Sequence, residues 1–224
     1  MVKAVLFDLG NTLVSYYTRE EFPGVLAECI GSCRRLLLKR GVGIREEGLW
    51  GRVNEQDHES PGHRVYPLED RLRHIFGAQD EETLGALCAA FTEPIFGLAT
   101  LHDDVKPTLG ELRMRGVKTA IVSNTPWGSP AGLWRRELDR LGLSPLVDEA
   151  VFCRDVGWRK PDPRVFIHAL ALLGIEAGDA LFVGDDPRWD VEGPRALGMR
   201  TALVDRTGRN PDALHGLVGL TKLL

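Results

Sequence analysis

Four side chains in this sequence have the types and the placement that phosphoryl transfer requires. Asp8, Ser123, Lys160 and Asp185 each lie at or shortly after the end of a short apolar run. A carboxylate can act as a nucleophile and form a covalent intermediate that water later hydrolyses. A divalent cation and an ammonium group offset the repulsion between that carboxylate and an incoming phosphate, and a hydroxyl adds a neutral hydrogen bond. The set therefore predicts phosphoryl-transfer chemistry.

Residues beside these four suit a cation and a phosphate ligand. Asp8 and Asp185 together offer carboxylate oxygens, which are the ligands that Mg²⁺ prefers in proteins. Gly10 and Asn11 can turn backbone N–H groups toward a phosphate as an anion-binding nest. Asn124, next to the predicted phosphate-binding hydroxyl, is assigned to the same group. The sequence predicts a site for Mg²⁺ and a small phosphorylated molecule.

Such a site needs a scaffold that brings distant segments together, and the apolar pattern predicts one. Five apolar runs alternate with helix-like segments, which is typical of a parallel α/β sheet. We therefore expect a doubly wound, Rossmann-like core. Because ligands bind at the carboxyl ends of the strands in such sheets, all four side chains are expected at one edge. The predicted strands are residues 2–7, 118–122, 149–153, 180–183 and 201–204, and the predicted helices are 105–115, 130–141, 163–173, 189–197 and 211–224.

One interval breaks this alternation. From residue 15 to 101 the pattern is helical and contains no convincing strand, and a run of this length is far too long for a loop in a compact domain. We expect an inserted all-helical cap at 15–101, and a core built from 1–14 and 102–224. The helices predicted in the insertion are residues 20–39, with a weak point at Pro23 and Gly24, then 46–57, 68–76 and 81–91.

Composition limits the partners. The chain is 43% hydrophobic and 27% charged with a formal net charge of −4, which gives no reason to expect nucleic acid or an anionic membrane as a partner. No apolar stretch reaches the roughly 20 residues that cross a bilayer. The four cysteines form no CxxC pair, so we expect a cytoplasmic location in a reducing compartment. A monomer and a homodimer both remain open.

Four segments of the chain, around Asp8, Ser123, Lys160 and Asp185, are called the first, second, third and last motifs below. In their order and at these strand ends, they resemble the motifs of the haloacid dehalogenase superfamily. The resemblance covers residues 1–14 and about 102–206, and the insertion lies where that family places its helical cap. It implies a phosphohydrolase in which Asp8 is the nucleophile that carries an aspartyl-phosphate. It also implies that Lys160 is the charge-stabilising catalytic base and that Asp185 is a ligand of Mg²⁺.

The resemblance assigns supporting roles as well. Ser123 corresponds to the phosphate-binding hydroxyl, and the backbone carbonyl of Gly10 corresponds to a metal ligand. Asp190 corresponds to the second acidic residue of the last motif. In the family this residue more often has a structural role, or lies near the metal without binding it directly. Asp186 is interpreted from its position as the N-terminal cap of the following helix.

Gly10 is also the main departure from the family pattern. The phosphatases usually carry an aspartate there, which protonates the leaving group and then activates water, a contribution typically worth about 10²- to 10⁴-fold. Three interpretations are open. The substrates have good leaving groups, such as acyl or anomeric phosphates. A residue of the insertion replaces the acid, with Asp57, His58 and His63 as candidates. Or the protein binds a phosphorylated ligand as a regulatory module with little catalysis.

Two other reactions of the family are weighed against this prediction. Its 2-haloacid dehalogenases use the same nucleophile without a metal and typically have neutral residues in the last motif, whereas Asp185 and Asp186 are acidic here. Its phosphonate-cleaving members need a cap lysine. Lys39 is the only lysine between residues 15 and 101, and it lies at the basic end of a predicted solvated helix. The magnesium-dependent phosphohydrolase is the prediction that these comparisons favour.

Substrate choice is expected to depend on the insertion, which in this family closes over the site and excludes water. Trp127, just after the second motif, is expected either to line the pocket or to wedge between core and cap. The other candidate substrate contacts are Tyr16, Trp50, His58, His63, Arg64 and Tyr66.

Overall fold

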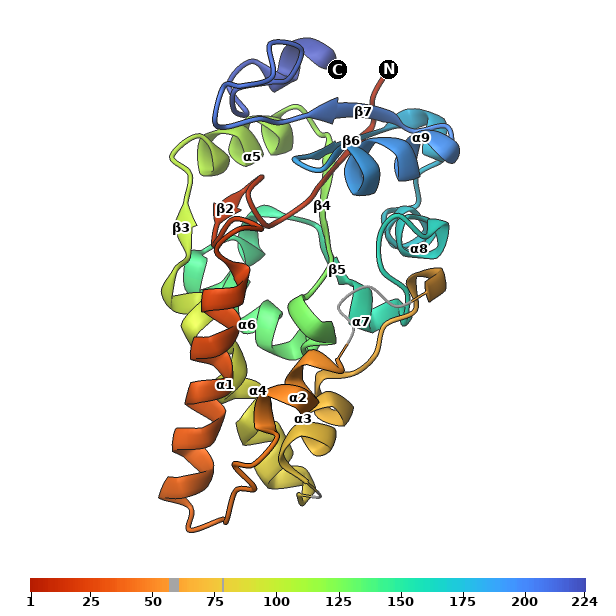
Figure 1. Cartoon of the computed structure of the whole chain (residues 1–224). Coiled ribbons are helices and arrows are strands. Elements are labelled where there is room, and N and C mark those ends of the chain that lie inside the picture. The colour runs from red at the N-terminus through yellow and green to blue at the C-terminus, as the bar shows by residue number, and fades with distance from the viewer. Residues whose placement is uncertain (57–60, 78) are drawn as a thin grey trace.

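A five-stranded parallel sheet forms the centre of the computed structural model, which describes residues 1–56, 61–77 and 79–224. The strand order is β5–β4–β1–β6–β7, so the chain winds outward from β1 in both directions (Figure 1). Every predicted strand is present within two residues of its expected ends, and the predicted fold class is confirmed. The strands are β1 (Ala4–Phe7), β4 (Lys118–Ser123), β5 (Glu149–Phe152), β6 (Ala180–Gly184) and β7 (Arg200–Leu203).

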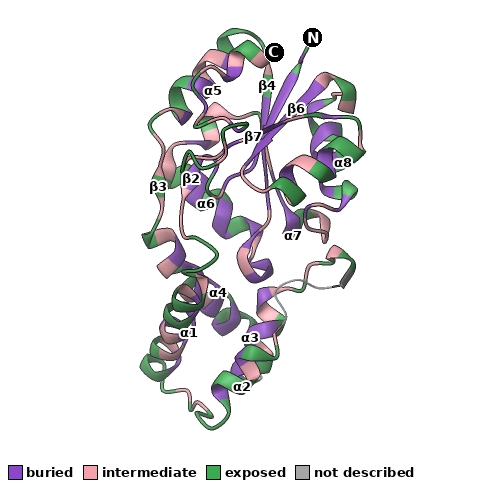
Figure 2. Cartoon of the chain, turned by 45° about the horizontal axis from the view of Figure 1, so that its top comes forward, coloured by how far each residue is buried: buried purple, intermediate pink, exposed green. Residues whose placement is uncertain are grey.

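Both faces of this sheet are covered, and side chains alternate between them. In β1, Val5 and Phe7 belong to one apolar cluster, whereas Ala4 and Leu6 belong to the other. All four are fully buried, which explains why β1 is a continuous apolar run without polar positions (Figure 2). The first face is covered by α5 (Val105–Met114) and α6 (Ala131–Leu141), and the second by α8 (Pro163–Leu173).

A helical insertion, drawn below the sheet in Figure 1, enters and leaves through a two-stranded antiparallel ribbon. The ribbon joins β2 (Val14–Ser15) to β3 (Thr100–Leu101), and the predicted domain boundaries fall within it. The sequence did not predict these strands, because two residues are too few to show an alternating pattern. The helices between them are α1 (Phe22–Lys39), α2 (Leu49–Asn54), α3 (Leu68–Phe76) and α4 (Glu81–Gly97).

The predicted helices of the insertion differ from the observed ones at their ends: the helix predicted from residue 46 begins at Leu49 and ends at Asn54, and two further differences involve prolines. Pro23 does not weaken α1, because it lies in the first turn, where a missing N–H leaves no hydrogen bond unmade. Helix α4 continues six residues past its predicted end and contains Pro94. In the described ranges, no helix has both the length and the apolar character that crossing a membrane requires.

The C-terminal segment corrects a prediction. Residues 211–224 do not form a helix; a single 3₁₀ turn covers Leu220–Leu223. Leu214 instead pairs with the free edge of β7, donating its N–H to Leu203 and accepting from the N–H of Asp205, both at 2.8 Å. Gly219, at φ 84°, breaks the helical pattern. Satisfying an exposed strand edge outweighs helix formation here.

A second connection joins the helical insertion to the core, opposite the ribbon. Residues 63–65, called the bridging segment below, run antiparallel to residues 157–159: Val65 N–H donates to Gly157 at 3.0 Å and Arg159 N–H donates to His63 at 2.9 Å. Nearby, Arg154 of α7 (Cys153–Val156) makes a two-pronged ion pair with Glu69 of α3. The insertion is therefore attached to the core at two separate places.

Trp127 adds a third contact between the two parts. Its ring stacks on Phe91 of α4 with 5.4 Å between centroids, and the residue is 4% exposed. The following residue, Gly128, has φ 65° and packs so closely on the backbone of Tyr66 that a Cβ would overlap the Tyr66 carbonyl. Trp127 thus wedges between core and insertion and also lines the pocket described next.

Candidate functional site

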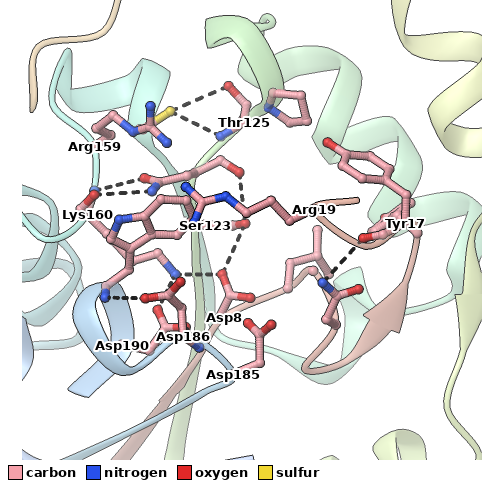
Figure 3. A pocket seen from close by; sticks show the side chains of 18 of the residues that line it. Asp8, Tyr17, Arg19, Ser123, Thr125, Arg159, Lys160, Asp185, Asp186 and Asp190 are labelled. Atoms are coloured by element: carbon pink, nitrogen blue, oxygen red, sulfur yellow. Dashed lines mark hydrogen bonds and ion pairs between the residues drawn. The ribbon is translucent and has the colours of Figure 1, made fainter. Parts of the chain in front are cut away.

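The strand ends bring Asp8, Ser123, Lys160 and Asp185 together in a pocket of about 1040 Å³ (Figure 3). Asp8 follows β1, Ser123 is the last residue of β4, Asp185 follows β6, and Lys160 lies in the loop before α8. This is the carboxyl edge of the sheet, where doubly wound folds place their ligands. The helical insertion forms the opposite wall, with Arg64 among its lining residues.

Asp8 is held by three donors from three segments. Lys160 Nζ donates to Asp8 Oδ1 at 2.6 Å, and Ser123 Oγ lies 3.4 Å from the same oxygen. Thr12 Oγ lies 3.4 Å from Asp8 Oδ2 and is fully buried. This contact of the Thr12 side chain was not foreseen; its only signal in the sequence is a hydroxyl four residues after the aspartate. Asp8 is 7% exposed, so its carboxylate is oriented and largely shielded from water.

Lys160 is buried between two carboxylates. Its Nζ donates to Asp8 Oδ1 at 2.6 Å and to Asp190 Oδ1 at 2.7 Å, and the residue is 1% exposed. Burial acts to lower the pKa of Lys160, but the charges of Asp190 and Asp8 outweigh it and hold that pKa above its ordinary value. Lys160 is therefore a fixed positive charge in contact with the predicted nucleophile.

The side chain of Asn124 is engaged with the backbone of Lys160. Its Oδ1 accepts the N–H of Lys160 at 2.8 Å, and its Nδ2 donates to the Lys160 carbonyl at 3.3 Å. These bonds fix the backbone from which the lysine extends. The role of Asn124 in phosphate binding stays a prediction, since its side chain has this other function in the structure.

A π-helical turn, η5 (Pro187–Glu192), presents Asp190 to the site, where the sequence predicted an α-helix from residue 189. Asp186 caps this turn as predicted, accepting from the N–H groups of Arg188 and Trp189. Asp190 Oδ2 accepts from the N–H of Asp186 at 3.1 Å, which leaves Oδ1 for Lys160. Single π turns are found frequently at functional sites.

Gly184 makes room for this arrangement, because a Cβ there would overlap the carboxyl group of Asp190. We expect Gly184→Ala to displace Asp190 from Lys160, to cost about 1–3 kcal/mol of unfolding free energy and to lower activity at least tenfold. Denaturant unfolding and phosphate release measure both effects. The matched control is Gly178→Ala, where a Cβ meets no atom within 4 Å; equal behaviour of the two variants would contradict the account.

Three carboxylates and one ammonium group meet here, and this donor set fits a divalent cation. Asp8, Asp185 and Asp190 can each offer an oxygen within 4.8 Å of the others. Burial, and then repulsion by Asp8 and Asp190, raise the pKa of Asp185 to about 8, which a bound cation would reverse. Oxygen ligands of this kind suit Mg²⁺. Asp8, Asp185 and the backbone carbonyl of Gly10 stay the predicted ligands, and Asp190 is a third carboxylate within reach of the same position.

The remaining predicted residues either line the pocket, lie elsewhere in the described structure, or fall outside the described ranges. Gly10, Asn11 and Asp186 line the pocket with the main site residues. Of the candidate substrate contacts, Tyr16, Arg64 and Tyr66 line it too. Among the described residues, Trp50 and His63 are not part of the lining, and Asp57 and His58 lie outside the described ranges. Residues that line the pocket but were not predicted to do so include Tyr17, Arg19, Arg159 and Trp189.

Comparison with known proteins defines the class. Residues 2–198 match the family described as haloacid dehalogenase-like hydrolase, and this chain belongs to that family. The ribulose-1,5-bisphosphate 5-phosphatase of Halopiger xanaduensis is 37% identical over 92% of this chain and 85% of its own length. The glyceraldehyde 3-phosphate phosphatase of Methanopyrus kandleri is 29% identical over 92% and 85%. The crystal structure of 2-haloacid dehalogenase from Pseudomonas syringae has a TM-score of 0.69, with 26% identity over 100% of this chain and 98% of that one.

Proposed function

We propose that this protein is a magnesium-dependent phosphohydrolase that forms an aspartyl-phosphate on Asp8. The observation that carries the proposal is the buried contact of Lys160 with Asp8 beside Asp185. An acidic cluster of this kind repels a phosphate unless a cation is present, and the donor set provides for one. Relatives named as phosphatases of small phosphorylated metabolites support the same reaction class.

The side chains have distinct tasks in this reaction. Asp8 attacks the phosphorus atom with a carboxylate oxygen, and the bond from phosphorus to the leaving oxygen breaks. Lys160 balances the charge on Asp8 and on the phosphate oxygens, while Ser123 offers a hydrogen bond to them. Water then attacks the phosphorus, frees Asp8 and yields inorganic phosphate. When bound, Mg²⁺ would supply Lewis-acid stabilisation of the phosphate charge.

No second aspartate assists at position 10, and the described residues of the insertion do not replace it. Those lining the pocket include arginines and tyrosines but no carboxylate or histidine. The hydroxyl of Tyr16 is buried, and burial raises its pKa far above the ordinary value, so it is a poor proton donor. The proposed substrates are therefore those whose leaving group departs without a proton.

Restoring the acid tests this account. A Cβ on Gly10 meets no atom within 4 Å, and its φ is not in the left-handed region, so Gly10→Asp fits the backbone. We expect several-fold faster turnover of esters with poor leaving groups, such as glycerol 3-phosphate, through general acid catalysis. Gly10→Asn is the matched control of similar size without an acid. No gain in a folded Gly10→Asp protein, or an equal gain in the control, would count against the account.

The direct test of the proposed function is release of inorganic phosphate from p-nitrophenyl phosphate, acetyl phosphate and sugar phosphates, with Mg²⁺ or with EDTA. Metal-dependent release that beryllofluoride blocks would support the aspartyl-phosphate route, because that anion mimics a phosphoryl group on a carboxylate. No release from any activated phosphate by folded, magnesium-loaded protein would favour the ligand-binding alternative.

A second candidate is a 2-haloacid dehalogenase. It is favoured by the likeness to a solved dehalogenase and by Gly10, since displacement of a halide needs no acid. Asp185 and Asp186 argue against it, because the dehalogenases of the family typically have neutral residues at these two positions. Chloride release from 2-chloropropionate in EDTA separates the two; rapid release there, with none of phosphate, would replace the proposed function.

A further inference from the structure

Aromatic residues with a polar atom gather around the pocket. All three tyrosines of the chain and three of its five tryptophans line it, whereas only one of its eight phenylalanines does. Tyrosine and tryptophan rings suit a surface that is apolar on one side and wet on the other, as at a ligand site. The distribution points to a ligand with an apolar part, beyond its phosphate.

Two of these rings belong to the packing between insertion and core. Trp127 stacks on Phe91, and Trp134 packs edge-on against Phe96 with 5.0 Å between centroids. Both tryptophans are 4% exposed. The rings that remain along the pocket are half-buried or exposed: Tyr16, Tyr17, Phe22, Tyr66 and Trp189.

These half-buried rings are held in place by neighbours. The guanidinium of Arg159 lies 5.2 Å from the centre of the Trp189 ring, and Tyr17 packs on Phe22 with 5.4 Å between centroids. Figure 3 shows Tyr17 across Asp8 from Lys160, so aromatic surface stands on the side of the nucleophile away from the lysine. Rings fixed in this way lose little freedom when a planar ligand stacks on them, which favours binding.

Gly10 supplies an independent constraint on the same ligand. With glycine at position 10, and with no carboxylate or histidine among the described residues of the insertion that line the pocket, the leaving oxygen must carry the negative charge. A phenolic oxygen has a pKa of about 10, whereas bulk water, which an alkoxide resembles more closely, has a pKa of about 15.7. A phenolate therefore departs unprotonated where an alkoxide does not. The pocket volume of about 1040 Å³ leaves room for a ring system beside the phosphate.

We propose that the substrates are aryl phosphates, in which the phosphate is esterified to a phenolic oxygen. This inference rests on the proposed function. The Asp8 carboxylate oxygen bonds to phosphorus, the bond between phosphorus and the aryl oxygen breaks, and its electron pair stays on the phenolate. A water oxygen then bonds to phosphorus, the bond from phosphorus to Asp8 breaks, inorganic phosphate leaves, and the proton of the water passes to solvent.

Four compounds separate the contribution of the ring from that of the leaving group: phenyl, benzyl, acetyl and glycerol phosphate, all with the wild-type protein and Mg²⁺. Stacking of the ring, worth about 1.5 kcal/mol, should give phenyl phosphate a KM roughly tenfold below that of acetyl phosphate. Benzyl phosphate keeps the ring but has an alkoxide leaving group. It should compete with phenyl phosphate at a similar concentration, yet turn over about 10²-fold more slowly.

A matched pair of variants locates the ring contact. Tyr17→Leu should raise the KM for phenyl phosphate by roughly tenfold and affect acetyl phosphate much less, and Tyr17→Phe should restore the wild-type KM. Acetyl phosphate turned over with a KM at or below that of phenyl phosphate would overturn the aryl assignment and leave the phosphohydrolase standing. Release from none of the four compounds would instead overturn the proposed function. The wild-type comparison decides the matter if Tyr17→Leu does not fold.

Discussion

Replacing Asp8 by asparagine is expected to lower phosphate release by on the order of 10⁴-fold or more, as loss of a covalent nucleophile does. The substitution keeps the shape of the side chain and its place between Lys160 and Thr12. It also removes one of three mutually repelling carboxylates, so the thermal midpoint measured in EDTA should not fall. Activity is lost without loss of the fold.

The comparison needs two measurements on one preparation: phosphate release from acetyl phosphate and a thermal melt in EDTA. Asp212→Asn is the control, since Asp212 is exposed and lies in the C-terminal segment, apart from the pocket lining. Asp8→Asn activity within tenfold of the wild type would show that water, or another side chain, attacks the phosphate directly. That result would remove the aspartyl-phosphate from the proposed function.

Lys160→Met is the second large effect that we expect. It removes the ammonium group from two buried carboxylates, Asp8 and Asp190, whose contacts with it are 2.6 and 2.7 Å. Leaving buried charge without its partner costs about 3–5 kcal/mol. In EDTA the free energy of unfolding should fall by that amount. Phosphate release should fall by about 10³-fold, because the fixed positive charge beside the nucleophile is gone.

The double variant Lys160→Met with Asp190→Asn separates the two effects. It removes the carboxylate of Asp190, which Lys160→Met leaves buried without its partner, so part of the lost stability should return while activity stays low. Lys3→Met is the control, since Lys3 pairs with Asp179 on the surface and should affect neither quantity. An unchanged unfolding free energy of Lys160→Met in EDTA would mean that the ion pairs do not hold the site together.

The sequence predicted those parts of the molecule that depend on local pattern. The strand of Ala4–Phe7 is a continuous apolar run because helices cover both of its faces, and such runs are visible without a structure. The four polar side chains at the strand ends follow directly once the runs are placed. Lys160 was found in this way although no helix or strand contains it.

What the sequence did not predict depends on contacts between distant segments. The Asn124 amide binds the backbone of Lys160, 36 residues later, and no local signal distinguishes this from a phosphate contact. The C-terminal segment reads as an apolar-striped helix, yet its Leu214 meets the edge of β7. The π turn that aims Asp190 depends on Gly184 in the preceding strand. In each case a contact between residues far apart in the sequence decides the local structure, and such contacts cannot be recognised from local sequence pattern.

The bridging segment has a further consequence, for hydrogen exchange. The amide hydrogens of Val65 and Arg159 are both bonded across the boundary between insertion and core. They can exchange with solvent deuterium only when that boundary separates, because neither bond lies within a single helix or sheet of either part. Their protection factors therefore report the free energy of separating the insertion from the core on this side, while Leu6 in the central strand reports global unfolding. Since Arg159 directly precedes Lys160, one exchanging amide records the motion of the insertion beside the catalytic centre.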